Sequence, residues 1–231
     1  MEFASPAFWV AVVQIIFIDI ILSGDNAVVI AMACRNLPDD QRRRGILWGV
    51  FGAVGLRVLL TAFAASLLSY PYLKLIGGLL LLWIGVKLLL PEKNRGQDLG
   101  GAASLWGAVR TIIVADFVMS LDNVVAVAAA SRNSLLLLLF GLAVSIPLIV
   151  WTSQWFMRLM DRYPIIIVLG AGLLGYVAGG MVASDALIKG WLDERLQVAH
   201  YVVGAFGAGL VMATGTWLAR RQNGRSRRRT Q

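Results

Sequence analysis

Long apolar runs constrain the fold of this chain more than any other feature of its sequence. Seven can be drawn between short polar joints, at residues 7–33, 46–69, 71–90, 104–131, 135–157, 164–184 and 201–219. A helix needs roughly 20 apolar residues to cross a ~30 Å hydrocarbon core. Because backbone groups in lipid must be satisfied within their own segment, each run is expected to be helical. The sequence therefore predicts an all-α membrane protein with seven transmembrane helices.

The composition supports this class and excludes others. Of the 231 residues, 58% are hydrophobic and 15% are charged, whereas a soluble domain has roughly 25% charged residues. With one cysteine, Cys34, and one histidine, His200, we expect neither an internal disulfide nor a metal site built from thiolate or imidazole. Residues 220–231 form a tail with six arginines, which favours contact with anionic lipid headgroups over nucleic acid. The tail could also serve only as a topology anchor.

The distribution of Lys and Arg predicts the orientation in the membrane. Fifteen of these residues fall on one side of the predicted topology, and three, Arg132, Lys189 and Arg195, fall on the other. Since positive residues stay in the cytoplasm, we expect the N-terminus outside and the C-terminus inside, in the plasma (inner) membrane. The first apolar run contains Asp19 and Asp25 and follows no Lys or Arg, so we expect a retained helix and not a signal peptide.

The sequence also repeats itself. Residues 19–36 align with residues 116–133 at an offset of 97, with nine of 18 positions identical. Further along, Tyr70-Pro71 matches Tyr163-Pro164 at an offset of 93. The alignment therefore pairs the first three apolar runs with the next three.

This pairing predicts the domain organisation. We expect one three-helix repeat in residues 1–90 and a second in residues 104–184. Because each repeat has an odd number of helices, the second is inverted in the membrane relative to the first. The seventh helix, 201–219, and the basic cytoplasmic tail, 220–231, lie outside the repeats.

The repeated motif Asp-x-x-x-Ser-x-Asp-Asn is the predicted functional site. Its members are Asp19, Ser23, Asp25 and Asn26 in the first copy and Asp116, Ser120, Asp122 and Asn123 in the second. A carboxylate in hydrocarbon costs at least ~2.5 kcal/mol, and such groups are ordinarily retained for function. Serine and asparagine could serve only to hold helices together, at ~0.6 kcal/mol each, but this reading does not account for four acids.

The chemistry of these side chains predicts which ligand the site takes. Carboxylate, amide and hydroxyl oxygens suit Mn²⁺, Ca²⁺ or Mg²⁺ better than Zn²⁺ or Cu⁺. Four aspartates cannot all remain ionised in a low-dielectric site without a cation or protons, so exchange of a metal ion for protons is plausible. On an unbroken helix Asp25 points away from the face that carries Asn26. Either Asp25 faces another neighbour, or the helix is unwound around Ser23-Gly24.

Arg57 stands in the middle of the second apolar run and has no counterpart in the second repeat. An isolated guanidinium at that depth is costly, so we expect it to contact at least one motif aspartate. Two roles stay open. It could form a fixed structural ion pair, or it could be a tethered cation that occupies or gates the empty site.

The doubled motif, the Arg-Asn that follows each copy and the mid-helix Arg57 resemble the TerC family of integral membrane proteins, most closely its shorter, YjbE-type bacterial members. This resemblance covers about residues 5–219. It implies a transporter and not an enzyme, with a role in manganese export or metal-ion homeostasis and a historical link to tellurium resistance. No permanently bound cofactor is implied. The acidic site of the family falls on Asp19, Asp25, Asn26, Asp116, Asp122 and Asn123.

Three other functions compete with metal export. A membrane aspartyl protease also pairs intramembrane acids, but its Gly-x-Gly-Asp signature is absent from both motif copies. An exporter of small organic molecules of the LysE type would share the fold. A scaffold without transport activity is the third, and for it the mid-membrane acids would be dispensable. The sequence leaves the ion selectivity, the coupling ion and the oligomeric state open.

Overall fold

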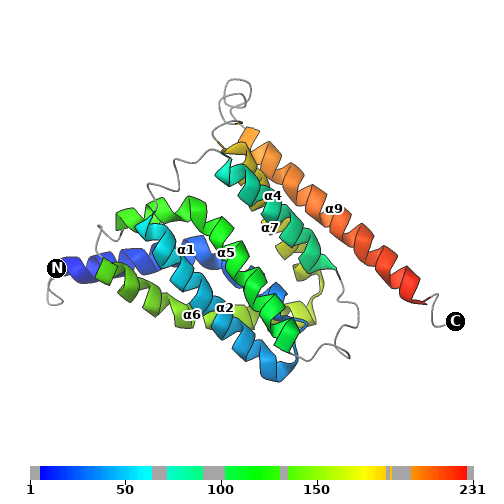
Figure 1. Ribbon diagram of the computed structural model, residues 1–231, viewed down its shortest axis with the longest axis horizontal. Coiled ribbons are helices and arrows are strands. Elements are labelled where there is room, and N and C mark those ends of the chain that lie inside the picture. Colours follow the sequence, from blue (N-terminus) through cyan, green and yellow to red (C-terminus); the bar gives the residue numbers. More distant parts are fainter. Residues whose placement is uncertain are drawn as a thin grey trace. The chain divides into compact units, whose positions relative to one another are not determined.

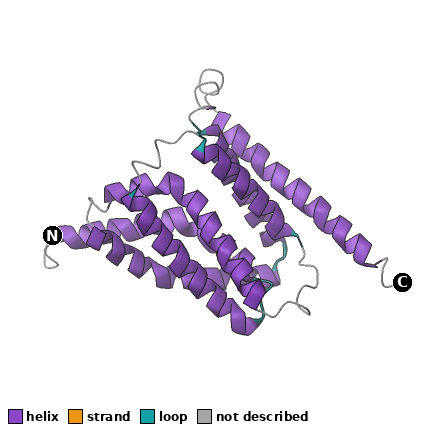
Figure 2. Cartoon of the chain, in the orientation of Figure 1, coloured by secondary structure: helices purple, strands orange, loops and turns teal. Residues whose placement is uncertain are grey.

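The described part of the chain is entirely helical between its turns and joints. A computed structural model describes residues 6–63, 72–90, 102–130, 135–185, 188 and 199–227. Within these residues there are seven helices and no strand (Figures 1 and 2). They are α1 (Pro6–Cys34), α2 (Asp39–Ala62), α4 (Leu73–Leu89), α5 (Ala102–Ala130), α6 (Leu135–Arg162), α7 (Ile165–Ala183) and α9 (Ala199–Arg227). The predicted all-α class is confirmed in the described residues, and each predicted apolar run overlaps one helix. Residues 64–69, 71 and 131 of these runs lie outside the described residues.

Several helices are longer than the apolar runs that predicted them. α2 begins at Asp39, whereas the apolar run begins at residue 46. Asp39 and Asp40 lie in its first turn, where negative charge is favourable beside the positive end of the helix dipole. α9 likewise continues to Arg227, beyond the predicted end at residue 219. An apolar run marks the part of a helix that can lie in lipid, and the helix continues where charged residues permit.

Four helices in the described residues are long and apolar enough to cross a membrane. The candidate spans are Asp39–Thr61, Leu139–Arg162, Ile165–Ala183 and His200–Gln222. Large apolar side chains lie exposed on them, including Trp151 and Phe206, as expected for surfaces that face lipid and not water. Their length and composition support a multi-pass membrane protein.

The helices group into two compact units. The first unit comprises Met1–Tyr70 and Leu105–Met157, and the second comprises Pro71–Ser104 and Arg158–Gln231. The first unit therefore holds α1, α2 and most of α5 and α6, and the second holds α4, α7 and α9. Helices that the repeat alignment pairs, such as α1 with α5 and α4 with α7, lie in the same unit. Each unit thus takes corresponding helices from both predicted repeats.

In the first unit, α2 packs against both α5 and α6. A Cβ added at Gly49 of α2 would overlap the Ile112 side chain of α5. The two helices therefore approach closely at this point. Leu142 of α6 is fully buried and packs against Val54 and Val58 of α2. These contacts hold the middle of α2 between two neighbours.

In the second unit, glycines bring helix backbones into contact. A Cβ added at Gly175 of α7 would overlap the carbonyl oxygen of Gly207 in α9, and one added at Gly179 would overlap that of Val203. On α4, a Cβ at Gly78 would lie 2.7 Å from a backbone carbonyl oxygen of α7. α7 therefore packs closely against α4 and α9 through small residues, a common way of joining helices in lipid.

Candidate ion site

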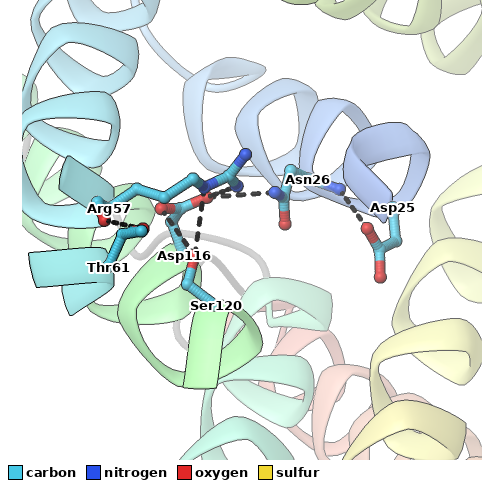
Figure 3. Close-up of polar contacts among 6 residues, drawn as sticks. All are labelled: Asp25, Asn26, Arg57, Thr61, Asp116 and Ser120. Atoms are coloured by element: carbon cyan, nitrogen blue, oxygen red, sulfur yellow. Dashed lines mark hydrogen bonds and ion pairs between the residues drawn. The ribbon is translucent and has the colours of Figure 1, made fainter. Parts of the chain in front are cut away.

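Four polar side chains meet inside the first unit, and we call them the polar cluster (Figure 3). α1 contributes Asn26, α2 contributes Arg57, and α5 contributes Asp116 and Ser120. Their exposed fractions are 4% for Asn26, 3% for Arg57, 6% for Asp116 and 0% for Ser120. Buried polar groups of this kind need hydrogen-bond partners, and these four side chains bond to one another.

The Asp116 carboxylate is the centre of the polar cluster. Its Oδ1 accepts a bond of 2.7 Å from Nη2 of Arg57 and one of 3.0 Å from Nδ2 of Asn26. Its Oδ2 accepts a bond of 3.2 Å from the hydroxyl of Ser120, one helical turn later. Nε of Arg57 donates to the same hydroxyl at 3.3 Å. Both carboxylate oxygens are therefore engaged, and a guanidinium balances the charge.

Asn26 also carries a buried oxygen without a hydrogen-bond partner among the described residues, its Oδ1. Since the Nδ2 of Asn26 donates to Asp116, the direction of Oδ1 is fixed as well. A buried acceptor left unpaired costs ~1–3 kcal/mol. Asn26 also lines a small cavity with a volume of about 10 Å³, together with Val29, Ile30, Ala53, Ile112 and Asp116. The amide oxygen is thus held in one direction, with an acceptor position that a cation or a water molecule can satisfy.

Asp25 is half-buried and is directed away from the polar cluster (Figure 3). Its Oδ1 accepts a bond of 2.9 Å from the backbone N–H of Asn26. α1 is a continuous helix from Pro6 to Cys34, so the alternative of an unwound segment around Ser23-Gly24 is wrong. The helical spacing instead turns Asp25 toward different surroundings from those of Asn26.

Four motif residues lie where the structure describes the helix but not the side chain: Asp19, Ser23, Asp122 and Asn123. Their place in a site stays a prediction. The prediction that Arg57 contacts a motif aspartate is confirmed by its ion pair with Asp116. Among the described side chains, no three of the types His, Cys, Asp or Glu converge as metal ligands.

One buried acid lies outside the motif, and sequence reasoning missed it. Asp185, 2% exposed, lies two positions after the end of α7, and its Oδ2 accepts a bond of 3.1 Å from the backbone N–H of Leu75. It thus satisfies a donor in the first turn of α4, whose own N-cap residue, Tyr72, makes no side-chain bond. An acid at the end of one apolar run does not reveal which helix it caps. The one available signal was the position of Asp185 in the joint after α7, where a carboxylate can cap a helix.

Comparisons with known proteins agree with the helical membrane architecture. The model of the family described as "Integral membrane protein TerC family" matches residues 4–223. Membrane protein YjbE of Bacillus subtilis (strain 168) is 46% identical over 188 residues, which cover 81% of this chain and 86% of that protein. YegH of Escherichia coli (strain K12) is 28% identical over 82% of this chain but only 40% of its own length. No solved structure matches. The chain belongs to the TerC family of integral membrane proteins.

Proposed function

We propose that this protein exports a divalent metal ion, Mn²⁺ in preference to Ca²⁺ or Mg²⁺, across the inner membrane. The observation that carries the proposal is the meeting of Asn26 and Asp116 in one buried cluster. α1 and α5 are repeat mates, and each contributes oxygens to the cluster. Ion sites of transporters built from inverted repeats form where the two repeats meet. The preference for Mn²⁺ comes from the resemblance to the family.

The oxygen chemistry of the polar cluster supports a hard cation as the cargo. Asp116 offers a carboxylate, Ser120 a hydroxyl and Asn26 an amide oxygen without a partner among the described residues. These are ligand types that Mn²⁺, Ca²⁺ and Mg²⁺ accept. Asp19, Asp25, Asp122 and Asn123 would extend the pathway along α1 and α5, with protons as the counter-cargo.

The space beside the cluster favours an ion over an organic molecule. The cavity at Asn26 and Asp116 has a volume of about 10 Å³, close to the room that one water molecule needs, whereas pockets for organic ligands commonly hold ~300–1,000 Å³. The other residues that line it, such as Val29 and Ile112, are apolar and offer no hydrogen bonds to an amino acid or similar substrate. The polar atoms that remain are oxygens suited to an ion.

The membrane topology is part of the proposal. We infer seven spans in two inverted repeats plus α9, with the N-terminus outside and the C-terminus in the cytoplasm. α9 has 29 residues and so spans ~44 Å at 1.5 Å per residue, more than the ~30 Å hydrocarbon core. Its arginine-rich end, where Arg221 stacks 3.8 Å over the Trp217 ring, would then reach the anionic headgroups.

Efflux of Mn²⁺ from reconstituted vesicles tests the function. Asp116→Asn, Asp25→Asn and Asp122→Asn each keep the side-chain shape and remove one charge, and each should lower efflux at least ~10-fold. Asp161→Asn is the matched control, because Asp161 is exposed near the end of α6. Normal Mn²⁺ efflux by all three motif variants would disprove the central site. Transport of organic substrates without competition by metal ions would instead indicate a LysE-type exporter.

A further inference from the structure

We propose that Arg57 is a tethered cation that competes with the transported ion for the Asp116 carboxylate. It occupies the carboxylate when the ion is absent and must leave for the ion to bind. This inference rests on the proposed export function and adds a built-in competitor to it. Three features of the polar cluster support it: the hydrogen bonds that Asp116 already accepts, the helix from which Arg57 extends, and the balance of charge.

Asp116 already accepts hydrogen bonds at both carboxylate oxygens while Arg57 is in place. Oδ1 already accepts bonds from Arg57 and Asn26, and Oδ2 accepts one from Ser120. A divalent ion coordinates oxygen at ~2.0–2.6 Å, but Nη2 of Arg57 stands only 2.7 Å from Oδ1. Two cations cannot share that approach at low dielectric. An ion that binds Asp116 therefore displaces the guanidinium.

Arg57 reaches the cluster from a helix that carries no copy of the motif. It extends from α2 and contacts Asp116 and Ser120, both members of the second copy on α5. An arginine has a long, flexible side chain whose head can move while its backbone stays in place. The same contacts that hold the guanidinium can therefore be released without moving α2.

Charge balance gives the exchange a physical reason. A buried carboxylate without a counter-charge is strongly unfavourable, so an empty site in the membrane needs a cation of its own. Arg57 supplies that cation when no ion is bound. In the same cluster, the Oδ1 of Asn26 is buried without a partner among the described residues, and Asn26 and Asp116 line one cavity. This oxygen accepts no hydrogen bond from the described residues while the guanidinium is in place, as expected for an atom that binds the transported ion only after Arg57 has left.

Equilibrium dialysis of Mn²⁺ against the purified full-length protein tests the competition. Arg57→Gln removes the tethered charge. If Arg57 leaves the carboxylate open in only about a tenth of the molecules, its removal tightens Mn²⁺ binding about tenfold. Binding by Arg57→Gln that is equal to wild type or weaker would show a fixed structural ion pair and overturn the inference. Absence of binding in both wild type and Arg57→Gln would overturn the export function together with it.

Arg57→Lys separates direct competition from a distant effect of charge. Lysine keeps the charge but has a single ammonium, which cannot hold Asp116 and Ser120 with the geometry of a guanidinium. A weaker competitor should give Mn²⁺ binding a few-fold tighter than wild type. Equal binding by Arg57→Lys and wild type would overturn the inference, whatever Arg57→Gln does. This variant also decides the question if Arg57→Gln does not fold.

Discussion

The two compact units differ in what they bury between their helices. The first unit buries an ion pair, Arg57 with Asp116, between α2 and α5. The second unit presses glycine backbones together, as at Gly175 and Gly207 between α7 and α9. The second unit also has a buried acid among its described residues, Asp185, which accepts a hydrogen bond at the start of α4.

This difference indicates that the polar cluster of the first unit binds a ligand, whereas the glycine contacts of the second unit stabilise the fold. Close packing of small residues joins helices in lipid without burying charge. A buried ion pair, in contrast, is often no better for stability than apolar residues of the same volume. The first unit keeps the pair although glycine packing was available, since Gly49 of α2 already lies against α5. We interpret the polar cluster as functional for that reason.

The largest effect is expected from a variant that removes one partner of the ion pair between Arg57 and Asp116. Asp116→Leu deprives the buried guanidinium of its Asp116 partner and should destabilise the protein by ~3–5 kcal/mol. The double variant Arg57→Met, Asp116→Leu removes both charges and should recover most of that loss. Unfolding in mild detergent measures both. A single variant as stable as the double variant would mean that the guanidinium costs no stability without Asp116. The contrast between the two units would then be wrong.

The next effect concerns glycine packing in the second unit. Gly207→Ala places a methyl group against the Gly175 carbonyl and should cost ~1–3 kcal/mol through overpacking. Gly209 is the matched control on the same helix, because a Cβ added there meets no described atom within 4 Å. Gly209→Ala should be neutral or stabilise α9 by up to ~1 kcal/mol. Thermal unfolding compares the two, and equal effects would refute the packing argument.

A smaller effect is expected at the buried acid of the second unit. Asp185→Ala removes an acceptor for the Leu75 N–H at the start of α4, and loss of such a cap costs ~0.5–2 kcal/mol. Mn²⁺ efflux should stay near wild type once the lower stability is allowed for, because Asp185 is not part of the polar cluster. A specific loss of efflux with unchanged stability would extend the ion pathway into the second unit.

The sequence was informative wherever a single segment carried the signal. The seven helices follow from the length of the apolar runs, and the direction of Asp25 follows from helical spacing along α1. The contact of Arg57 with a motif aspartate also follows, because a lone charge in hydrocarbon needs a counter-charge.

What the sequence could not predict depends on contacts between distant segments. No local pattern indicates that Asp185 caps α4, 110 positions away. The choice of Asp116 as the aspartate that pairs with Arg57 was open for the same reason. The start of α2 at Asp39 was missed because six polar residues and a glycine precede its apolar part. Helix ends of this kind are set by caps and charges, which hydropathy does not measure.

The smallest expected effect tests whether α1 stays a continuous helix during transport. A Cβ added at Gly24 meets no described atom within 4 Å, and the repeat mate of Gly24 is Leu121, so a larger side chain is compatible with the motif. Gly24→Ala should therefore stabilise α1 by up to ~1 kcal/mol and leave Mn²⁺ efflux within about twofold of wild type, since ~0.4 kcal/mol is a factor of two. Vesicle efflux at saturating Mn²⁺ measures this. A strong loss of efflux in a well-folded Gly24→Ala protein would mean that α1 must unwind at Gly24 during the cycle, and the first unit would then have to change its backbone to move the ion.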